Sequence, residues 1–301
     1  MKLTKRDIIK KYLKKLTFNN KKSLNLNDDV YYDSEKKLIF STDTYEDGIH
    51  FLDASLPEKF IKKIFRSSVS DIFAKGAKPT TYFLSLSLPK INNKWIKKFE
   101  NELNKESKKF GLFLGGGDII KSKKLTITIS VIGNINKKPV LRNGAKINDD
   151  IYITGNIGDS YIGLLIKQKR LNLSKLNSYF TNAFLEPCIQ KKFSKYLTFF
   201  ASSSIDISDG LIKDLQSICV ASKCGAHIDF SKLPISMHMK KIIDKNIIKL
   251  KNVFSKGDDY QILFTANKKY RKSISKVSKK TNTKITRVGV IKTGNFIKMT
   301  N

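Results

Sequence analysis

The sequence predicts a mixed α/β fold with two domains. The chain has 301 residues, 40% of them hydrophobic, which suffices for two cores of ordinary size. Short segments with the apolar or alternating pattern of strands follow one another, with amphipathic helical segments between them. A polar turn at residues 148–150 separates the two halves. We therefore expect an N-terminal domain over residues 1–147 and a C-terminal α/β domain over residues 148–301.

A basic amphipathic helix is expected first. Thr4 and Asp7 are typical of a helix start, and the apolar residues that follow share one helical face. These residues are Ile8, Ile9, Tyr12, Leu13 and Leu16. The segment lacks the apolar core of a signal peptide, and no other stretch has the apolar length of a membrane span. We expect this face to pack against the protein core, with membrane docking as the alternative.

The remaining elements alternate between strands and helices. Strands are expected at residues 38–41, 84–88, 125–131, 151–154, 226–230, 261–265 and 285–291. The first of them presents the polar residues 41–44 at its end. A helix with a regularly spaced apolar face follows and is closed by Gly76 and Pro79. Further helices are expected through Trp95 in the first half and through Leu215 in the second.

The charge of the chain is strongly basic. Its net charge is +32, with 58 Lys and Arg against 26 Asp and Glu, a balance that is typical of nucleic-acid-binding proteins. The lysines are spread from Lys2 to Lys298 and arginine is sparse, so we expect no specific nucleic-acid partner. The three cysteines, Cys188, Cys219 and Cys224, lack disulfide and zinc spacing, which fits a reducing cytoplasm.

The few acidic residues gather in short groups beside apolar or glycine residues. Adjacent carboxylates repel, so holding several together costs free energy unless a cation or strong donors neutralise them. Oxygen ligands without His or Cys favour a hard ion such as Mg²⁺ or Ca²⁺. A turn or a helix cap explains any single group, and the repetition favours a metal site. The groups are Asp28 with Asp29, Asp43, Asp71, Asp118, Asp206 with Asp209, and Asp258 with Asp259.

A glycine run precedes one of these aspartates. Gly115, Gly116 and Gly117 follow the apolar residues 112–114 and lead into Asp118. We interpret the run as a strand-to-loop turn whose backbone N–H groups could approach phosphate oxygens. It is neither a P-loop nor the spaced dinucleotide fingerprint, so a tight turn without a ligand stays an alternative.

The segment 204–210 is a second candidate site. In an extended segment Asp206 and Ser208 share one face, and Asp209 then turns into a helix, which Ser208 or Asp209 could simply cap. A Ser-His-Asp hydrolase is not indicated, because a Gly-x-Ser-x-Gly elbow is missing and no histidine has an obvious Ser partner. His50 lies close to Gly48, just beyond the polar residues 41–44, and is a candidate substrate contact.

Eight short segments, taken in order, resemble thiamine-monophosphate kinase of the aminoimidazole-ribonucleotide-synthetase-like superfamily. They are Asn27-Asp28-Asp29, Ser41-Thr42-Asp43-Thr44, Gly48-Ile49-His50-Phe51, Ser70-Asp71 with Ala74-Lys75-Gly76-Ala77-Lys78-Pro79, Gly116-Gly117-Asp118, Arg142-Asn143-Gly144-Ala145, Asp206-Ile207-Ser208-Asp209-Gly210-Leu211, and Gly257-Asp258-Asp259-Tyr260. The segments span residues 27–260. The resemblance implies the fold of that superfamily, with an N-terminal mixed-sheet domain that binds ATP and magnesium and forms a homodimer.

The resemblance also implies roles for individual residues. Several Mg²⁺ ions would be held by Asp29, Ser41, Thr42, Asp43, Asp71, Asp118, Asp206 and Asp209. ATP, the co-substrate, would contact Gly117, Asp118, Arg142 and Ser208, and thiamine monophosphate would contact His50 and Asp258. The implied reaction is an in-line phosphoryl transfer that yields thiamine diphosphate and ADP. No residue is assigned as a general base, because a phosphate monoester is largely doubly ionised at pH 7.

Some positions depart from the family pattern. Asp258 stands where the family has Glu, and after Asn301 the sequence lacks the aromatic tail that covers the thiamine ring in the family. We expect these departures to bear on substrate identity. The alternatives are a sister ATP-dependent enzyme acting on another small phosphate-containing metabolite, and an inactive homologue. Selenophosphate synthetase fits poorly, because it needs a reactive Cys near the N-terminus and the first cysteine here is Cys188.

Overall fold

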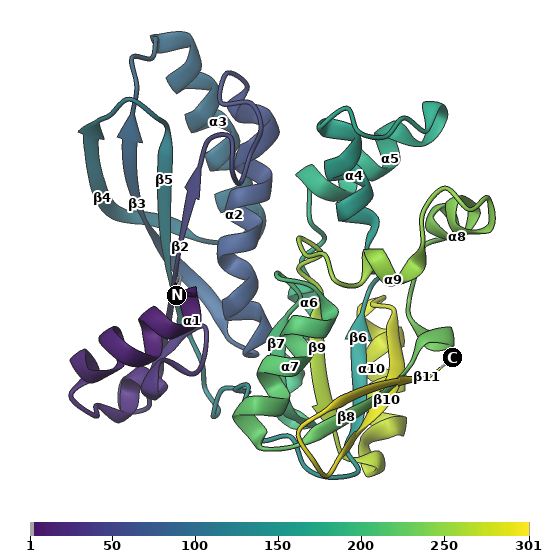
Figure 1. Ribbon diagram of the computed structural model, residues 1–301. Coiled ribbons are helices and arrows are strands. Elements are labelled where there is room, and N and C mark those ends of the chain that lie inside the picture. Colours follow the sequence, from purple (N-terminus) through teal and green to yellow (C-terminus); the bar gives the residue numbers. More distant parts are fainter. Residues whose placement is uncertain (1–2, 301) are drawn as a thin grey trace.

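Two mixed sheets, each covered by helices, make up the protein (Figure 1), which confirms the predicted α/β class. The computed structural model describes residues 3–300. The first sheet uses residues 31–134 and the second uses residues 150–300, so the predicted boundary at 147/148 falls between their strands. The boundary itself stays a prediction. Within the described residues, no helix has the length and apolar character needed to cross a bilayer.

The first sheet has the strand order β1-β2-β5-β3-β4. All neighbouring strands are antiparallel except β3 and β4, which are parallel. The strands are β1 (Tyr31–Asp33), β2 (Leu38–Glu46), β3 (Lys78–Leu88), β4 (Phe113–Lys121) and β5 (Thr126–Asn134).

Helices α2 (Pro57–Ala74) and α3 (Asn93–Phe110) lie on one side of this sheet (Figure 1). The apolar face predicted for α2 is buried, because its residues pack with the inward side chains of β5 in one core. These α2 residues are Phe60, Ile61, Ile64, Phe65, Val69, Ile72 and Phe73. Helix α2 also touches β7, α5 and α6 of the second half, so it lies at the border of the two halves.

The second sheet has the strand order β11-β8-β10-β6-β9-β7. Its strands are β6 (Asp150–Thr154), β7 (Ala201–Asp206), β8 (Gly225–Asp229), β9 (Ile262–Ala266), β10 (Ile285–Lys292) and β11 (Ile297–Thr300). Strand β11 is an addition to the strands expected from the sequence. The longer helices are α4 (Asp159–Lys167), α5 (Asn177–Leu185), α7 (Leu211–Ser222), α8 (Met237–Asp244) and α10 (Arg271–Thr281), and the short ones are α6 (Lys191–Ser194) and α9 (Leu250–Val253).

Alternate residues of β6 face two separate cores. Ile151 and Ile153 pack with α7, whereas Tyr152 packs with Phe193 of α6 and Ile274 of α10. Helix α7 therefore covers one face of the second sheet, and α6 with α10 covers the other. The end of β7 lies beside α2, which brings the second sheet to the border between the halves.

Three local expectations are wrong. Strand β2 continues through Ser41 to Glu46, so the polar residues lie inside the strand and alternate between its two faces. The glycine run lies inside β4 and does not form a turn, because β3 pairs with it as far as Lys121. The N-terminal helix begins at Lys5, with the predicted Thr4–Asp7 cap, but its apolar residues such as Tyr12 are exposed.

Candidate active site

The acidic groups converge where α2 meets β2 and β7. Asp71 lies on α2, Asp206 ends β7, and Asp29 precedes β1. Carboxylate oxygens of these three residues lie within 4.8 Å of one another, in a geometry that could hold a metal ion. Asp43, on the inward side of β2, adds its charge to the same group. Residues far apart in the sequence thus form one anionic cluster, which we call the acidic cluster.

Crowding and burial raise the pKa values of three carboxyl groups of the acidic cluster, those of Asp43, Asp71 and Asp206. The pKa of Asp43 rises to about 7 through burial and through the charges of Asp206 and Asp29. The pKa of Asp206 rises to about 6 for the same reason, with Asp29 as the main charge. Burial and the charge of Asp206 raise the pKa of Asp71 well above its usual value. The acidic cluster is therefore unstable as a set of carboxylates unless cations neutralise it.

Two basic residues neutralise part of the charge. The Lys75 ammonium, completely buried, lies 2.8 Å from Asp28 and 3.8 Å from Asp29, and it donates to the Ser204 carbonyl at 3.0 Å. Arg142 pairs with Asp29 through its guanidinium, and its backbone N–H donates to Asp28 at 2.7 Å. The family resemblance implied a role for Arg142 but none for Lys75, because a single lysine carries no signal in a chain this rich in lysine.

Strand β7 is fixed at its end by hydrogen bonds to carboxylates. Asp206 accepts a hydrogen bond from the hydroxyl of Ser70 at 2.7 Å. Asp214, in the first turn of α7, accepts the backbone N–H groups of Asp209 at 3.2 Å and Gly210 at 3.0 Å. Burial and the charges of Asp206 and Asp209 raise the pKa of Asp214 to about 8. The alternative in which Ser208 or Asp209 caps the helix is wrong, because Asp214 accepts these N–H groups and α7 has no side-chain cap at its start.

The segment after Lys256 packs against the segment 206–210 through its backbone. A Cβ atom on Gly257 would lie 1.8 Å from the Ser208 carbonyl oxygen, so only glycine fits there. The next N–H, of Asp258, donates to the same carbonyl at 2.9 Å. Asp258 and Tyr260 have φ values of 69° and 50°, a left-handed conformation that costs free energy in residues other than glycine. Such strain is typical of functional segments.

A second polar group lies around Asp258. Its carboxylate is 3.1 Å from the Lys63 ammonium and accepts the Tyr260 hydroxyl at 3.0 Å. Lys63 is buried and lies 3.5 Å from the centre of the Phe184 ring. Burial and the nearby Lys63 charge lower the pKa of His50, which keeps this histidine neutral. Lys63, whose charge acts on both His50 and Asp258, was not predicted from the sequence.

Some of the predicted site residues lie away from the acidic cluster in the fold. Asp118 is on β4, three strands away from β2, which corresponds to roughly 14 Å. Gly117 lies beside it, and a Cβ atom there would be 1.8 Å from the Leu84 carbonyl oxygen, so close pairing with β3 explains this glycine. The Thr42 hydroxyl bonds to Ser130 at 2.7 Å on the opposite face of β2 from Asp43.

The other predicted residues lie at or near the acidic cluster. The Ser41 hydroxyl donates to the Ser68 carbonyl at 3.4 Å, which attaches β2 to α2. Ser208 and Asp209 have exposed side chains at the end of β7. The chain therefore assembles most of the predicted residues and leaves Gly117, Asp118 and Thr42 on other surfaces.

Comparison with known proteins identifies the family. Residues 27–135 match the family model described as AIR synthase related protein, N-terminal domain. A thiamine-monophosphate kinase of Buchnera aphidicola subsp. Acyrthosiphon pisum is 36% identical over 303 residues, covering 97% of this chain and 92% of that protein. The chain belongs to the thiamine-monophosphate kinase family. The kinase of Haemophilus influenzae is 32% identical and covers 96% of this chain and 90% of its own length.

Solved structures agree with membership of the thiamine-monophosphate kinase family. The structure of thiamine monophosphate kinase from Aquifex aeolicus superposes with a TM-score of 0.86 at 26% identity, covering 99% of this chain and 98% of that one. A structure described as AaThiL complexed with AMPPCP and TMP gives 0.84 at 25% identity, with 99% and 96% covered. The resemblance and the superfamily fold expected from the sequence are confirmed.

Proposed function

We propose that this protein transfers the γ-phosphoryl group of ATP to the phosphate of thiamine monophosphate. An oxygen of the acceptor phosphate forms the new P–O bond, the bond between the γ-phosphorus and the β–γ bridging oxygen breaks, and thiamine diphosphate and ADP leave. The supporting observation is the acidic cluster: four buried or half-buried carboxyl groups, three of which (Asp43, Asp71 and Asp206) have raised pKa values, in a family with this activity. Such a cluster is suited to phosphoryl transfer, which depends on charge neutralisation and positioning.

The acidic cluster fits the several Mg²⁺ ions of this proposal. Its donors are all oxygens, and one oxygen of Asp29 is buried without a hydrogen-bond partner among the described residues. Asp29, Asp43, Asp71 and Asp206 would hold the ions, with Ser41 and Asp209 at the edge of the cluster. When bound, Mg²⁺ supplies the positive charge that lets the anionic phosphates approach these carboxylates.

Protein groups orient the phosphates of ATP. Arg142 is held against Asp29 on one side, and its Nε–H is buried without a hydrogen-bond partner among the described residues. That N–H is a free donor for a phosphate oxygen, which supports the proposed ATP contact. Ser208 is exposed two residues after Asp206, the last residue of β7. Its hydroxyl is the second proposed donor to ATP, after the Arg142 N–H.

The acceptor end of the site contains His50, Lys63 and Asp258. The His50 Nδ1 accepts the backbone N–H of Glu46 at 3.0 Å, so the neutral ring carries its proton on Nε2 and can donate there. We propose that His50 and Asp258 contact thiamine monophosphate and that Lys63 orients Asp258. The acceptor phosphate is largely dianionic at pH 7, so its oxygen attacks without a general base.

We propose that the active form is a homodimer built through the first sheet. Strand β4 is an edge strand whose nine residues are all exposed, including Phe113, Leu114, Ile119 and Ile120. An apolar edge of this kind is typical of an interface. A second copy covering this surface would bring its Gly117 and Asp118 to the acidic cluster of its neighbour, which would complete the predicted ATP site. The open face that carries Thr42 would be covered as well.

The reaction is tested by measuring ADP and thiamine diphosphate together. Purified protein is incubated with ATP and Mg²⁺, with and without thiamine monophosphate, and the thiamine products are separated by chromatography. We expect equal amounts of ADP and thiamine diphosphate, which Asp43→Ala abolishes. Asp244→Ala, an exposed position on α8, serves as the matched control and keeps activity. ADP release that does not depend on thiamine monophosphate would refute the proposed acceptor.

A further inference from the structure

A second cleft lies on the far side of α2 from the acidic cluster. It encloses about 1110 Å³ between the two halves and is bordered by the ends of α2 and α3, the segment after β5, the segment 186–199 and residues 281–283. Phe73 and Arg66 line it, and they lie roughly 160° and 140° around the helix from Asp71, at 100° per residue. The cleft is therefore separate from the acidic cluster.

The charge of this cleft is almost entirely positive. Arg66 and six lysines line the cleft. Glu186 is the one carboxylate residue among the described residues that line it. None of the lysine ammonium groups of the cleft has a described carboxylate within 4.0 Å. Three of these lysines come from each half of the chain: Lys78, Lys109, Lys137, Lys191, Lys192 and Lys195.

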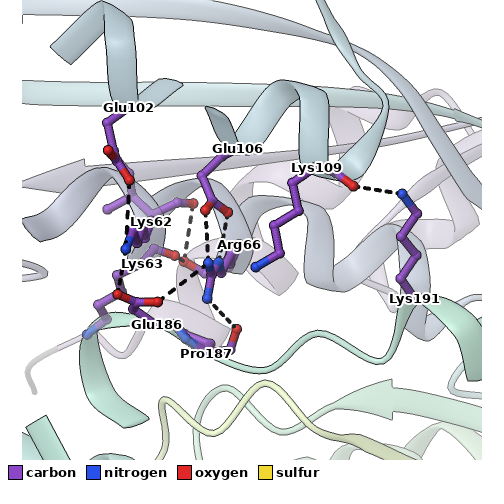
Figure 2. Close-up of polar contacts among 11 residues, drawn as sticks. Lys62, Lys63, Arg66, Glu102, Glu106, Lys109, Glu186, Pro187 and Lys191 are labelled. Atoms are coloured by element: carbon purple, nitrogen blue, oxygen red, sulfur yellow. Dashed lines mark hydrogen bonds and ion pairs between the residues drawn. The ribbon is translucent and has the colours of Figure 1, made fainter. Parts of the chain in front are cut away.

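The nearby arginine has its own carboxylates. Arg66 binds Glu106 through two N–H groups at 2.7 and 2.8 Å, and Glu186 lies 3.8 Å away, as Figure 2 shows. The Lys62 ammonium lies 2.6 Å from the other carboxylate oxygen of Glu186. Glu186 is therefore already paired, and the lysines of the cleft are left without a counter-ion from the described residues. We call this group the lysine cleft.

The lysines are close enough to affect one another. The Lys191 ammonium donates to the Lys109 carbonyl at 2.9 Å, which holds it in the cleft (Figure 2). Burial and the charge of Lys78 lower the pKa of Lys191. Lys137 lies 3.5 Å from the centre of the exposed Phe199 ring. Positive charges gathered in a concave, partly apolar surface concentrate their field on a small volume.

We propose that the lysine cleft binds a small anion with at least two phosphate groups. Lysines are strong point-charge donors to phosphate oxygens, and groups from both halves can reach one ligand in the cleft. Free inorganic polyphosphate and a nucleotide share this chemistry. A nucleotide would in addition lay its base on Phe199. The lysine cleft differs from the general lysine excess of the chain, because lysines from both halves line one concave volume there.

The test measures binding of inorganic triphosphate, and of ATP in parallel, by calorimetry in EDTA at physiological ionic strength. Without a metal the acidic cluster repels both probes, so the kinase site does not contribute. The cleft variant carries Lys78→Gln and Lys191→Gln. The control variant carries Lys272→Gln and Lys276→Gln on α10 and lowers the net charge by the same amount. We expect affinity to fall about tenfold or more in the cleft variant and to change less than about twofold in the control.

A second readout locates the ligand. Cys188 is exposed and lines the lysine cleft, whereas Cys219 and Cys224 are buried. We expect inorganic triphosphate to slow modification of Cys188 by a thiol reagent in the wild type and not in the cleft variant. If ATP binds more tightly than inorganic triphosphate and Phe199→Ala removes the difference, the ligand is a nucleotide. If the two probes bind equally, the ligand is a polyphosphate. Equal loss of affinity in the cleft and control variants, or no protection of Cys188, overturns the proposal.

Discussion

Two groups of opposite charge border opposite faces of helix α2, and within each group the charges repel one another. On one face Asp71 joins the acidic cluster, and on the other Arg66 borders the lysine cleft. The acids are buried or half-buried, so desolvation adds to repulsion and the pKa values of Asp43, Asp71 and Asp206 rise. The lysines are mostly exposed, so water screens their repulsion. The comparison suggests that the acidic cluster needs a cation whenever its carboxyls are ionised, whereas the lysine cleft can be empty or occupied at little cost.

The largest expected effect separates the functions of the two faces. Asp71→Asn should lower the kinase rate about 1000-fold, because it removes a carboxylate that we propose as a magnesium ligand, and bound magnesium would be worth several kcal/mol to the reaction. The same change removes repulsion, so the metal-free protein should melt about 2–4 °C higher. Steady-state kinetics and calorimetry measure the two effects. An active Asp71→Asn protein, or one that melts lower without metal, would contradict our account of the acidic cluster.

Mixing two inactive variants tests whether the acidic cluster is completed by a second chain. Asp43→Asn and Asp118→Asn should each be inactive. After subunit exchange, half of the dimers are mixed and each contains one intact site, so activity should return to roughly a quarter of the wild-type value. Activity that stays at the level of the single variants, under conditions where exchange is shown by mass spectrometry, argues against a shared site.

A change at the acceptor end of the site should alter the KM for thiamine monophosphate without a matching change in the KM for ATP. Lys63→Met leaves the Asp258 carboxylate without its cation, so we expect the KM for thiamine monophosphate to rise about tenfold. The KM for ATP should change less than about twofold. Asp258→Glu, which keeps the charge and adds one methylene, is the matched control and should keep most activity. An equal rise in both KM values would show that Lys63 has a general structural role.

The smallest expected effect is a pH dependence of stability without metal. The folded pKa values of Asp206, Asp43 and Asp214, about 6, 7 and 8, lie above the ordinary value of 3.8. The folded state therefore binds more protons than the unfolded state, and stability falls as pH rises from about 4 to 8. Melting curves in EDTA should show the melting temperature falling by a few degrees over this pH range, and Mg²⁺ should reverse the fall at pH 8. A flat profile would contradict the repulsion.

The sequence predicted the acidic cluster because acidic residues are few beside the basic ones, 26 against 58, and the grouping of the aspartates stands out. Lys63 and Lys75 could not be found in the same way, since they are two among 58 basic residues and only the fold places them beside carboxylates. Asp214 was missed because a first-turn acid is usual in a helix. The glycine run was misinterpreted because close pairing of β3 and β4 also requires glycine at position 117.

The fold class and the order of most elements followed from periodicity. The N-terminal segment was placed wrongly because its apolar face predicts burial without saying which surface covers it. The same limit applies to the edge strand β4. Its exposed apolar residues indicate an interface but do not identify the partner. Contacts with a second copy are outside what local patterns can predict.

The most direct test compares the two faces of α2 in one assay. Thiamine diphosphate and ADP are measured from ATP, Mg²⁺ and thiamine monophosphate with the wild type, Asp71→Asn, and the lysine-cleft variant Lys78→Gln with Lys191→Gln. We predict equal product amounts from the wild type and the cleft variant, and almost none from Asp71→Asn. Thiamine diphosphate formation that survives Asp71→Asn would contradict the central claim that the acidic face of α2 is the kinase site.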